Sequence, residues 1–153
     1  MTIVPDDKDW TWVLTRPCPE CGFDAVSLPR QDIAPLVRST ATQWLAILGM
    51  PTAVLRRSAR SDRWSTLEYA CHVRDVFRIY DERLQLMLTT NEPTYPNWDQ
   101  DKSAIDDGYN DQDPVAVAAQ LASAADLLAT HFDTVVGPAW ERRGNRSDGA
   151  RFT

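Results

Sequence analysis

The residue with the clearest potential for metal or acid–base chemistry is His72, one of two histidines in the chain. It lies in a stretch typical of the start of a long amphipathic helix, with Ser65 as N-cap and Glu68 at the spacing of a capping box. Trp64 and Tyr69 are spaced as a hydrophobic staple. Because His72 shares its helix face with apolar side chains, its ring nitrogens need hydrogen-bond partners or a metal ion.

Two further polar residues bear on the role of this histidine. Asp75 lies about one turn beyond His72, where a carboxylate can orient an imidazole that binds a metal. Its alternative role is that of an exposed helix carboxylate. The other histidine, His131, lies near the end of a later helix, where we expect a structural role. No residue receives a catalytic role from the sequence alone.

Cys18 and Cys21 form a C-x-x-C pair in a proline-rich segment that is predicted to be a turn. The spacing suits two zinc thiolates or a redox pair. No second C-x-x-C or C-x-x-H follows, so a standard zinc ribbon is unsupported, and no βαβ pattern indicates a thioredoxin-like site. Two interpretations stay open: a structural metal knuckle with ligands from elsewhere, and two plain thiols on a turn, which we favour.

These residues must be positioned by helices. Apolar side chains recur at helical spacing over about 33–48, 66–88 and 114–136, and no strong strand pattern occurs. Asp32 is predicted to cap the first of these helices and Asp113 the third. We therefore expect an all-α fold.

Two irregular segments accompany the helices. Residues 1–26 are predicted to form an arm that carries the C-x-x-C pair and packs across the domain. Residues 91–112 form a long connection, and loops of this length are often functional. In that connection, Trp98 could line a pocket together with Asp99 and Asp101, or it could be an aromatic lid over the helical core.

Composition narrows the class of protein. The chain of 153 residues is long enough for a single domain, which we place at 1–153. A net charge of −6 excludes nucleic acid as the expected partner, and no segment reaches the length of a membrane span. The N-terminus lacks the pattern of a signal peptide, and three cysteines fit a reducing compartment, so we expect a cytoplasmic protein.

The connection between the first two helices has local positive charge, which comes from Arg56, Arg57, Arg60 and Arg63. We interpret it as a solvated loop. An anion-binding role is the alternative, because the guanidinium group matches carboxylates and phosphates in geometry.

Four segments occur together in this order: Trp64-Ser-x-Leu-Glu-Tyr-x-x-His-Val-Arg-Asp-Val, Arg83-Leu, Trp98-Asp99 and Arg146-Ser-Asp-Gly-x-x-Phe-Thr. In these segments the chain resembles the DinB-like superfamily. More narrowly, it is similar to actinobacterial DinB-like proteins related to the N-terminal domain of mycothiol-dependent maleylpyruvate isomerase. The resemblance covers most of the chain, from about Trp10 to Thr153.

The resemblance implies an up-down-down-up four-helix bundle with a divalent metal, often zinc or nickel, at one end. In the family, three histidines hold the metal: one comes from the second helix, which His72 matches, and two come from an H-x-x-x-H on the fourth. It also implies a small-molecule substrate and a low-molecular-weight thiol, such as mycothiol, as co-substrate in a transfer or isomerisation reaction.

The sequence departs from this pattern in its ligands. It has no H-x-x-x-H and only three long helical segments, so we expect either a chain truncated before the fourth helix or a member that has lost its metal triad. Cys18, Cys21, Asp99 and Asp101 are the weaker candidates for completing a site with His72.

Two hypotheses follow from this departure. The first is a metal-dependent, thiol-using transferase or isomerase with His72 as a ligand. The alternative is a non-catalytic helical bundle that acts through self-association or partner binding. A missing helix would leave an apolar groove exposed, so both hypotheses predict association, most simply as a homodimer.

Overall fold

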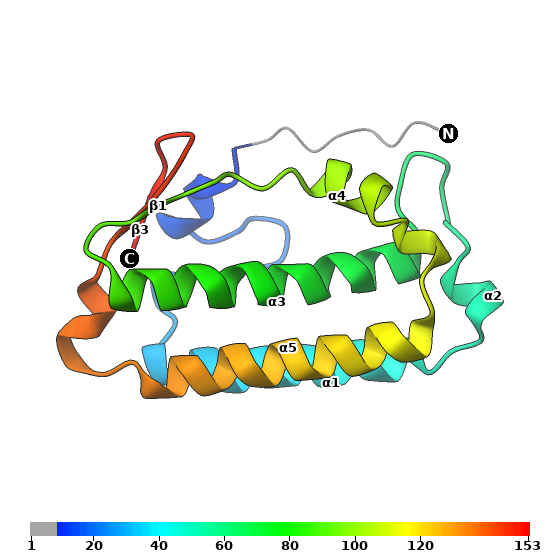
Figure 1. Ribbon diagram of the computed structural model, residues 1–153, viewed down its shortest axis with the longest axis horizontal. Helices are drawn as coiled ribbons and strands as arrows, with labels where there is room; N and C mark the ends of the chain where they lie inside the picture. The colour runs from blue at the N-terminus through cyan, green and yellow to red at the C-terminus, as the bar shows by residue number, and fades with distance from the viewer. Residues whose placement is uncertain (1–8) are drawn as a thin grey trace.

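Three long helices dominate the computed structural model, which describes residues 9–153 (Figure 1). They are α1 (Ile33–Leu48), α3 (Thr66–Thr89) and α5 (Pro114–Thr134). The first two begin and end within one residue of the prediction, and α5 ends two residues early. The all-α class is therefore confirmed.

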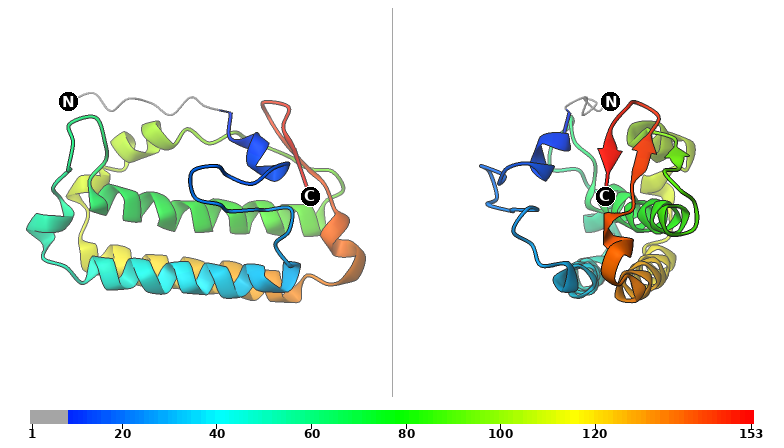
Figure 2. Two further views of the ribbon diagram at one scale, coloured as in Figure 1. Left: turned by 180° about the vertical axis from the view of Figure 1, so that it is seen from behind. Right: turned by 90° about the vertical axis from the view of Figure 1, so that its left-hand side faces the viewer.

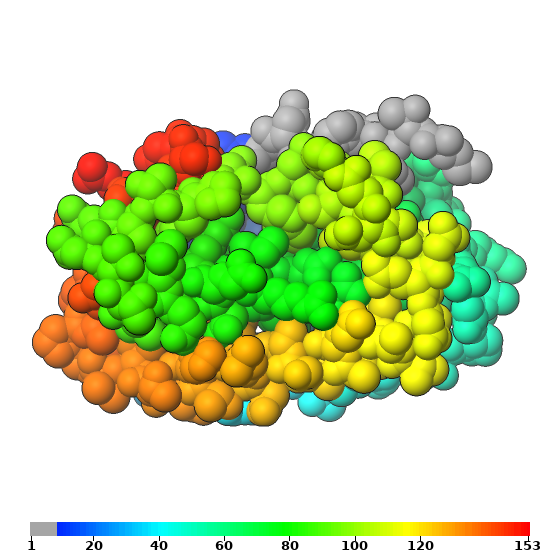
Figure 3. Space-filling view, viewed as in Figure 1, coloured from blue at the N-terminus to red at the C-terminus, as the bar shows by residue number. Residues whose placement is uncertain are grey.

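The direction of the long helices gives the bundle its topology. Helices α3 and α5 run the same way, and α1 runs opposite to both (Figures 1 and 2). Two parallel neighbours need a long return, and the crossover at 90–113 provides it above α3 (Figure 3). This order, up-down-down, matches the first three helices of the up-down-down-up bundle that the resemblance implies.

Helix α5 is the central element, because it packs against both α1 and α3, which contact each other much less. Three of its alanines, Ala124, Ala125 and Ala129, are buried and let the neighbouring helices approach closely. Larger side chains fill the remaining space, among them the fully buried Leu67 and Leu121. Each such side chain contributes roughly 1.5–3 kcal/mol relative to exposure.

The start of α3 forms as predicted. The Glu68 amide donates to the Ser65 hydroxyl oxygen at 3.2 Å, and the Ser65 amide donates to the Glu68 carboxylate at 2.6 Å. Trp64 and Tyr69 meet edge to face with ring centroids 5.4 Å apart. Together these contacts fix the entry of the chain into the helix that carries His72.

The caps of the other two helices differ. Asp113 caps α5 by accepting the amide of Val115, as predicted. The predicted cap of α1 is wrong, because the Asp32 side chain makes no capping bond. The reason is that Asp32 already has helical backbone angles, as the last residue of a 3-10 turn that leads directly into α1.

Short elements connect and cover the bundle. A three-stranded sheet, with β1 parallel to β2 and β2 antiparallel to β3, joins the crossover to the C-terminal hairpin. The sequence did not predict these strands, because two or three residues carry no periodic signal. A turn follows Arg146, with Gly149 in the left-handed region at φ 94°. The short elements are β1 (Thr94–Tyr95), β2 (Gly144–Arg146), β3 (Arg151–Phe152), α2 (Thr52–Leu55), α4 (Gln100–Asp106), η1 (Thr11–Leu14), η2 (Arg30–Asp32), η3 (Tyr109–Asp111) and η4 (Gly137–Glu141).

The N-terminal arm lies beside the C-terminal hairpin above α3 (Figures 1 and 2). Residues 1–8 of the predicted arm lie outside the described residues. Within 9–153, one helix, α5, has the length and apolar composition of a membrane span. Its buried residues form the centre of the bundle core, which is a sufficient reason for that composition.

Candidate functional site

The imidazole of His72 lies between two indole rings. Its centroid is 5.1 Å from that of Trp98, and the two rings are stacked with an interplanar angle of 6°. On the other side, Trp64 lies 5.2 Å away at 55°. The fold therefore brings together two segments, around Trp64 and Trp98, that are more than thirty residues apart in sequence.

The position of Trp98 is fixed by the helix that follows it. Its Nε1–H donates to the Ser103 hydroxyl at 2.7 Å. Asp99 caps that helix, α4, by accepting the amide of Lys102 at 2.9 Å. The indole ring thus stacks on His72 in one defined orientation.

The inner nitrogen of His72 has no partner. Its Nδ1 is buried and forms no hydrogen bond. Burial lowers the pKa of His72 below its ordinary value of 6.5, and the charge of Asp75 opposes that shift only in part. The imidazole is therefore neutral at pH 7, the form that binds metal ions.

Asp75 faces a different set of groups. Arg74 donates to both of its carboxylate oxygens, at 2.9 and 2.8 Å, and the Tyr109 hydroxyl donates at 2.6 Å. Arg78 adds a bond at 3.1 Å. Burial alone would raise the pKa of Asp75, but the bonds from Arg74 and Tyr109 hold that pKa below its usual value. Asp75 thus contacts these three residues, and acts on His72 only through its charge.

A buried polar network extends from this ion pair, and no motif or periodic pattern predicted it. The other terminal nitrogen of Arg74 donates to the side-chain oxygens of Gln112, at 2.7 Å, and Gln120, at 2.9 Å. The Cys71 thiol donates weakly to the Tyr109 carbonyl and to Gln112. Burial raises the pKa of Cys71 to about 11, so this thiol is unreactive. The network fastens the crossover to α3 and α5.

The second histidine pairs with a carboxylate. His131 Nδ1 lies 2.5 Å from Asp81 Oδ1, which joins α5 to α3. The expected structural role of His131 fits this contact, although the partner was not foreseen. Asp81 carries no periodic or motif signal, and its position opposite His131 depends on how the two helices pack.

The other candidate ligands lie elsewhere. Cys18 and Cys21 are free thiols on the N-terminal arm. Among residues 9–153, no group of three or more His, Cys, Asp or Glu side chains is arranged to hold a metal ion. His72 therefore belongs to no such group in the part of the chain described, and the atom that it would offer to a metal is its unpaired Nδ1.

A groove of about 680 Å³ lies between the arm, the crossover and the C-terminal hairpin. Trp98, Asp99 and Asp101 line it together, as one of the two interpretations of this segment expected. Trp10 from the arm and Tyr80 from α3 contribute aromatic walls. Trp98 thus lines this groove and also stacks on His72.

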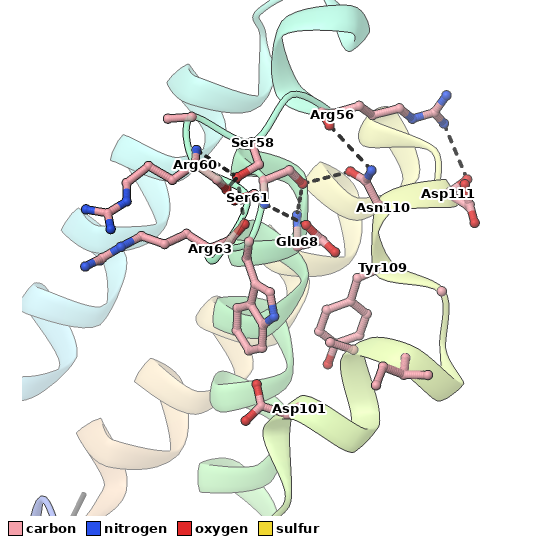
Figure 4. A pocket seen from close by; sticks show the side chains of 16 residues that line it. Arg56, Ser58, Arg60, Ser61, Arg63, Glu68, Asp101, Tyr109, Asn110 and Asp111 are labelled. Carbon is pink, nitrogen blue, oxygen red and sulfur yellow. Dashed lines mark hydrogen bonds between the residues drawn. The ribbon is translucent and has the colours of Figure 1, made fainter. Parts of the chain in front are cut away.

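A second pocket, of about 840 Å³, lies at the start of α3 (Figure 4). Three of the four arginines of the preceding loop, Arg56, Arg60 and Arg63, are among the residues that line it. Arg56 donates to the backbone carbonyls of Asp111 and Gln112, and Arg60 pairs with Asp62 at 2.9 Å. In Figure 4 the guanidinium groups of Arg60 and Arg63 extend away from Tyr109 and Asn110. This arrangement agrees with a solvated loop.

No protein-family model matches the sequence, and no curated protein matches it. One solved structure is similar: YfiT from Bacillus subtilis, described as a probable metal-dependent hydrolase with an unusual four-helix bundle topology. The TM-score is 0.71 at 18% sequence identity, over 80% of this chain and 72% of that chain. The likeness shows that the chain shares the helical-bundle fold of that protein, and at this identity it is evidence for the fold alone.

Proposed function

We propose that this protein is a metal-dependent enzyme of DinB-like type, in which His72 is one ligand of a divalent ion such as zinc or nickel. The observation that carries the proposal is the buried, unpaired Nδ1 of a neutral histidine. A buried polar atom without a partner costs about 1–3 kcal/mol, a loss that a metal bond would reverse. The description of YfiT as a probable metal-dependent hydrolase supports the same direction.

The remaining ligands come from donors that residues 9–153 of one chain do not provide. A bound ion with an open position would act as a Lewis acid and lower the pKa of a coordinated water or thiol. The residues of this chain supply the surroundings: the indole rings of Trp64 and Trp98 pack against the imidazole and hold its orientation. We propose a small-molecule substrate and a low-molecular-weight thiol such as mycothiol as co-substrate, in the cytoplasm.

Metal analysis with matched histidine variants tests the proposal. The purified protein is titrated with Zn²⁺ and with Ni²⁺, and bound metal is quantified after gel filtration. His72→Ala is expected to reduce the affinity at least about tenfold, since even indirect changes around metal ligands have effects of that size. His131→Ala, which removes the histidine paired with Asp81, is the control and is expected to retain the metal. Equal binding by wild type and His72→Ala would refute the proposal.

A second candidate function rests on a partly exposed apolar stripe of α3, in which two half-buried valines lie between two exposed tyrosines. Tyr69, Val73, Val76 and Tyr80 follow one another at helical spacing, and both tyrosines are exposed. Such a stripe can pair with a second copy in a non-catalytic homodimer. Sedimentation analysis separates the candidates: a metal-free dimer that is insensitive to His72→Ala but dissociates in Tyr80→Glu favours association as the function.

A further inference from the structure

The C-x-x-C segment forms a closed turn. The Cys18 amide donates to the Phe23 carbonyl at 2.8 Å, and the Gly22 amide donates back to the Cys18 carbonyl at 2.8 Å. Gly22 has a φ of 74°, in the left-handed region that favours glycine, so the chain can reverse directly after Cys21. The turn holds both cysteines on one short, hydrogen-bonded loop.

Backbone amides surround the first sulfur of this turn. The amides of Cys21 and Glu20 donate to the sulfur of Cys18, and the thiol of Cys21 hydrogen-bonds to it as well. Donors placed in this way stabilise negative charge on a sulfur, and the thiolate is the form that binds metals. The turn thus provides two adjacent sulfurs and the hydrogen bonds that stabilise negative charge on one of them.

The third cysteine shows what a plain structural thiol looks like in this protein. Cys71 is fully buried, donates to acceptors and has a raised pKa. Cys21 is exposed and Cys18 is half-buried, and the sulfur of Cys18 accepts hydrogen bonds. No helix begins at the C-x-x-C turn, so it lacks the helix N-terminus that activates many thiol oxidoreductases.

We propose that Cys18 and Cys21 form a thiolate knuckle that binds a thiophilic divalent ion of the zinc class, separate from His72. The spacing of two residues between the sulfurs is the one that zinc sites use. The sequence alone favoured two plain thiols; the closed turn and the amide donors to Cys18 favour the knuckle. Zinc prefers four ligands, and residues 9–153 of the same chain add no third protein donor. The other positions are therefore filled from outside them.

Cobalt(II) titration of the whole chain in a metal-free reductant tests this inference. Cobalt substitutes for zinc, and bonds to thiolates give a ligand-to-metal charge-transfer absorption that histidine ligands do not give. We expect that absorption in wild type and undiminished in His72→Ala, and its loss in Cys18→Ser and in Cys21→Ser. Addition of Zn²⁺ should displace the cobalt and remove the absorption.

Two controls make the result decisive. Circular dichroism verifies that each serine variant is folded, which we expect because both positions lie on the surface arm. Stoichiometry identifies the source of the remaining ligands: one ion per two chains means that two knuckles share it, and one ion per chain means that solvent completes it. Absence of thiolate charge transfer in folded wild type would overturn the knuckle. It would leave the His72 proposal standing, because that proposal is measured with the histidine variants.

Discussion

Helix α3 carries two polar side chains, His72 and Arg74, that are two residues apart and have opposite surroundings. Arg74 is 4% exposed, and each of its three guanidinium nitrogens donates to an acceptor on Asp75, Gln112 or Gln120. His72 is two residues away, and its buried Nδ1 faces no partner at all. One site is a complete network of buried polar groups, and the other is an incomplete one between two aromatic rings.

The difference distinguishes buried polar side chains that stabilise the fold from buried polar side chains that are candidates for binding a ligand. A satisfied network fastens elements together, and here it ties the crossover to the bundle. An unsatisfied buried atom lowers stability, and a position that keeps one is a candidate for ligand binding. By this criterion Arg74, although more deeply buried and charged, is structural, and His72 is the position at which we propose a ligand.

The largest expected effect comes from breaking the satisfied network. In Arg74→Met, the carboxylate of Asp75 and the two glutamine oxygens lose their shared donor while Asp75 remains buried. We expect the free energy of unfolding to fall by about 3–5 kcal/mol in urea denaturation. Arg78→Ala removes the exposed donor of the same Asp75 and is expected to cost less than about 1 kcal/mol. Similar losses in the two variants would contradict the assignment.

A smaller effect is expected when one hydrogen bond of that network is removed. Tyr109→Phe deletes the hydroxyl that donates to Asp75 at 2.6 Å and should cost about 1–2 kcal/mol at pH 7.

The dependence of this effect on pH follows from the sign of the Asp75 shift. Its folded-state pKa is depressed, so its contribution to stability is complete above the unfolded value of about 3.9 and is lost as pH falls through the folded value. The difference between wild type and Tyr109→Phe should therefore shrink below about pH 4. Urea denaturation from pH 7 down to pH 3 measures it, and a constant difference would show that the hydroxyl does not stabilise the carboxylate.

The bundle could be predicted because its signals are local. The apolar spacing of 33–48 and 66–88, and the cap at Ser65, depend only on neighbouring residues, and the structure reproduces them. The cap at Asp32 was predicted wrongly because a 3-10 turn before α1 extended the helical backbone past it. The two- and three-residue strands had no local signal, since they exist only because the crossover meets the hairpin.

The sequence allowed us to predict one residue of the candidate site, His72, but not the residues that surround it. His72 stood out because a histidine on an apolar face needs a partner. The stacking of Trp98 on it, the pairing of His131 with Asp81 and the network of Arg74 all join residues from different helices or from the crossover. Such contacts depend on how helices pack, which spacing along one helix does not specify.

The smallest expected effect, and the sharpest test of the comparison, comes from filling the unsatisfied site. His72→Phe keeps an aromatic ring between Trp64 and Trp98 but removes the unpaired nitrogen. In the metal-free protein we expect a gain of about 1 kcal/mol in stability at pH 7, since a buried unpaired polar group is costly. His131→Phe is the control and should lower stability, because it leaves Asp81 without its partner.

The same variant should change the pH dependence in a defined window. The folded-state pKa of His72 is depressed by burial, so below about pH 6.5 the unfolded chain binds the proton more readily, and wild type loses stability as pH falls from that value. His72→Phe lacks this group, so its stability advantage over wild type should widen as pH falls below about 6.5. The stability difference between wild type and Tyr109→Phe, in contrast, should shrink as pH falls. A gain in stability together with loss of metal binding would mean that α3 gives up stability at His72 in order to keep a ligand, whereas a loss of stability would mean that the imidazole is as well placed as Arg74.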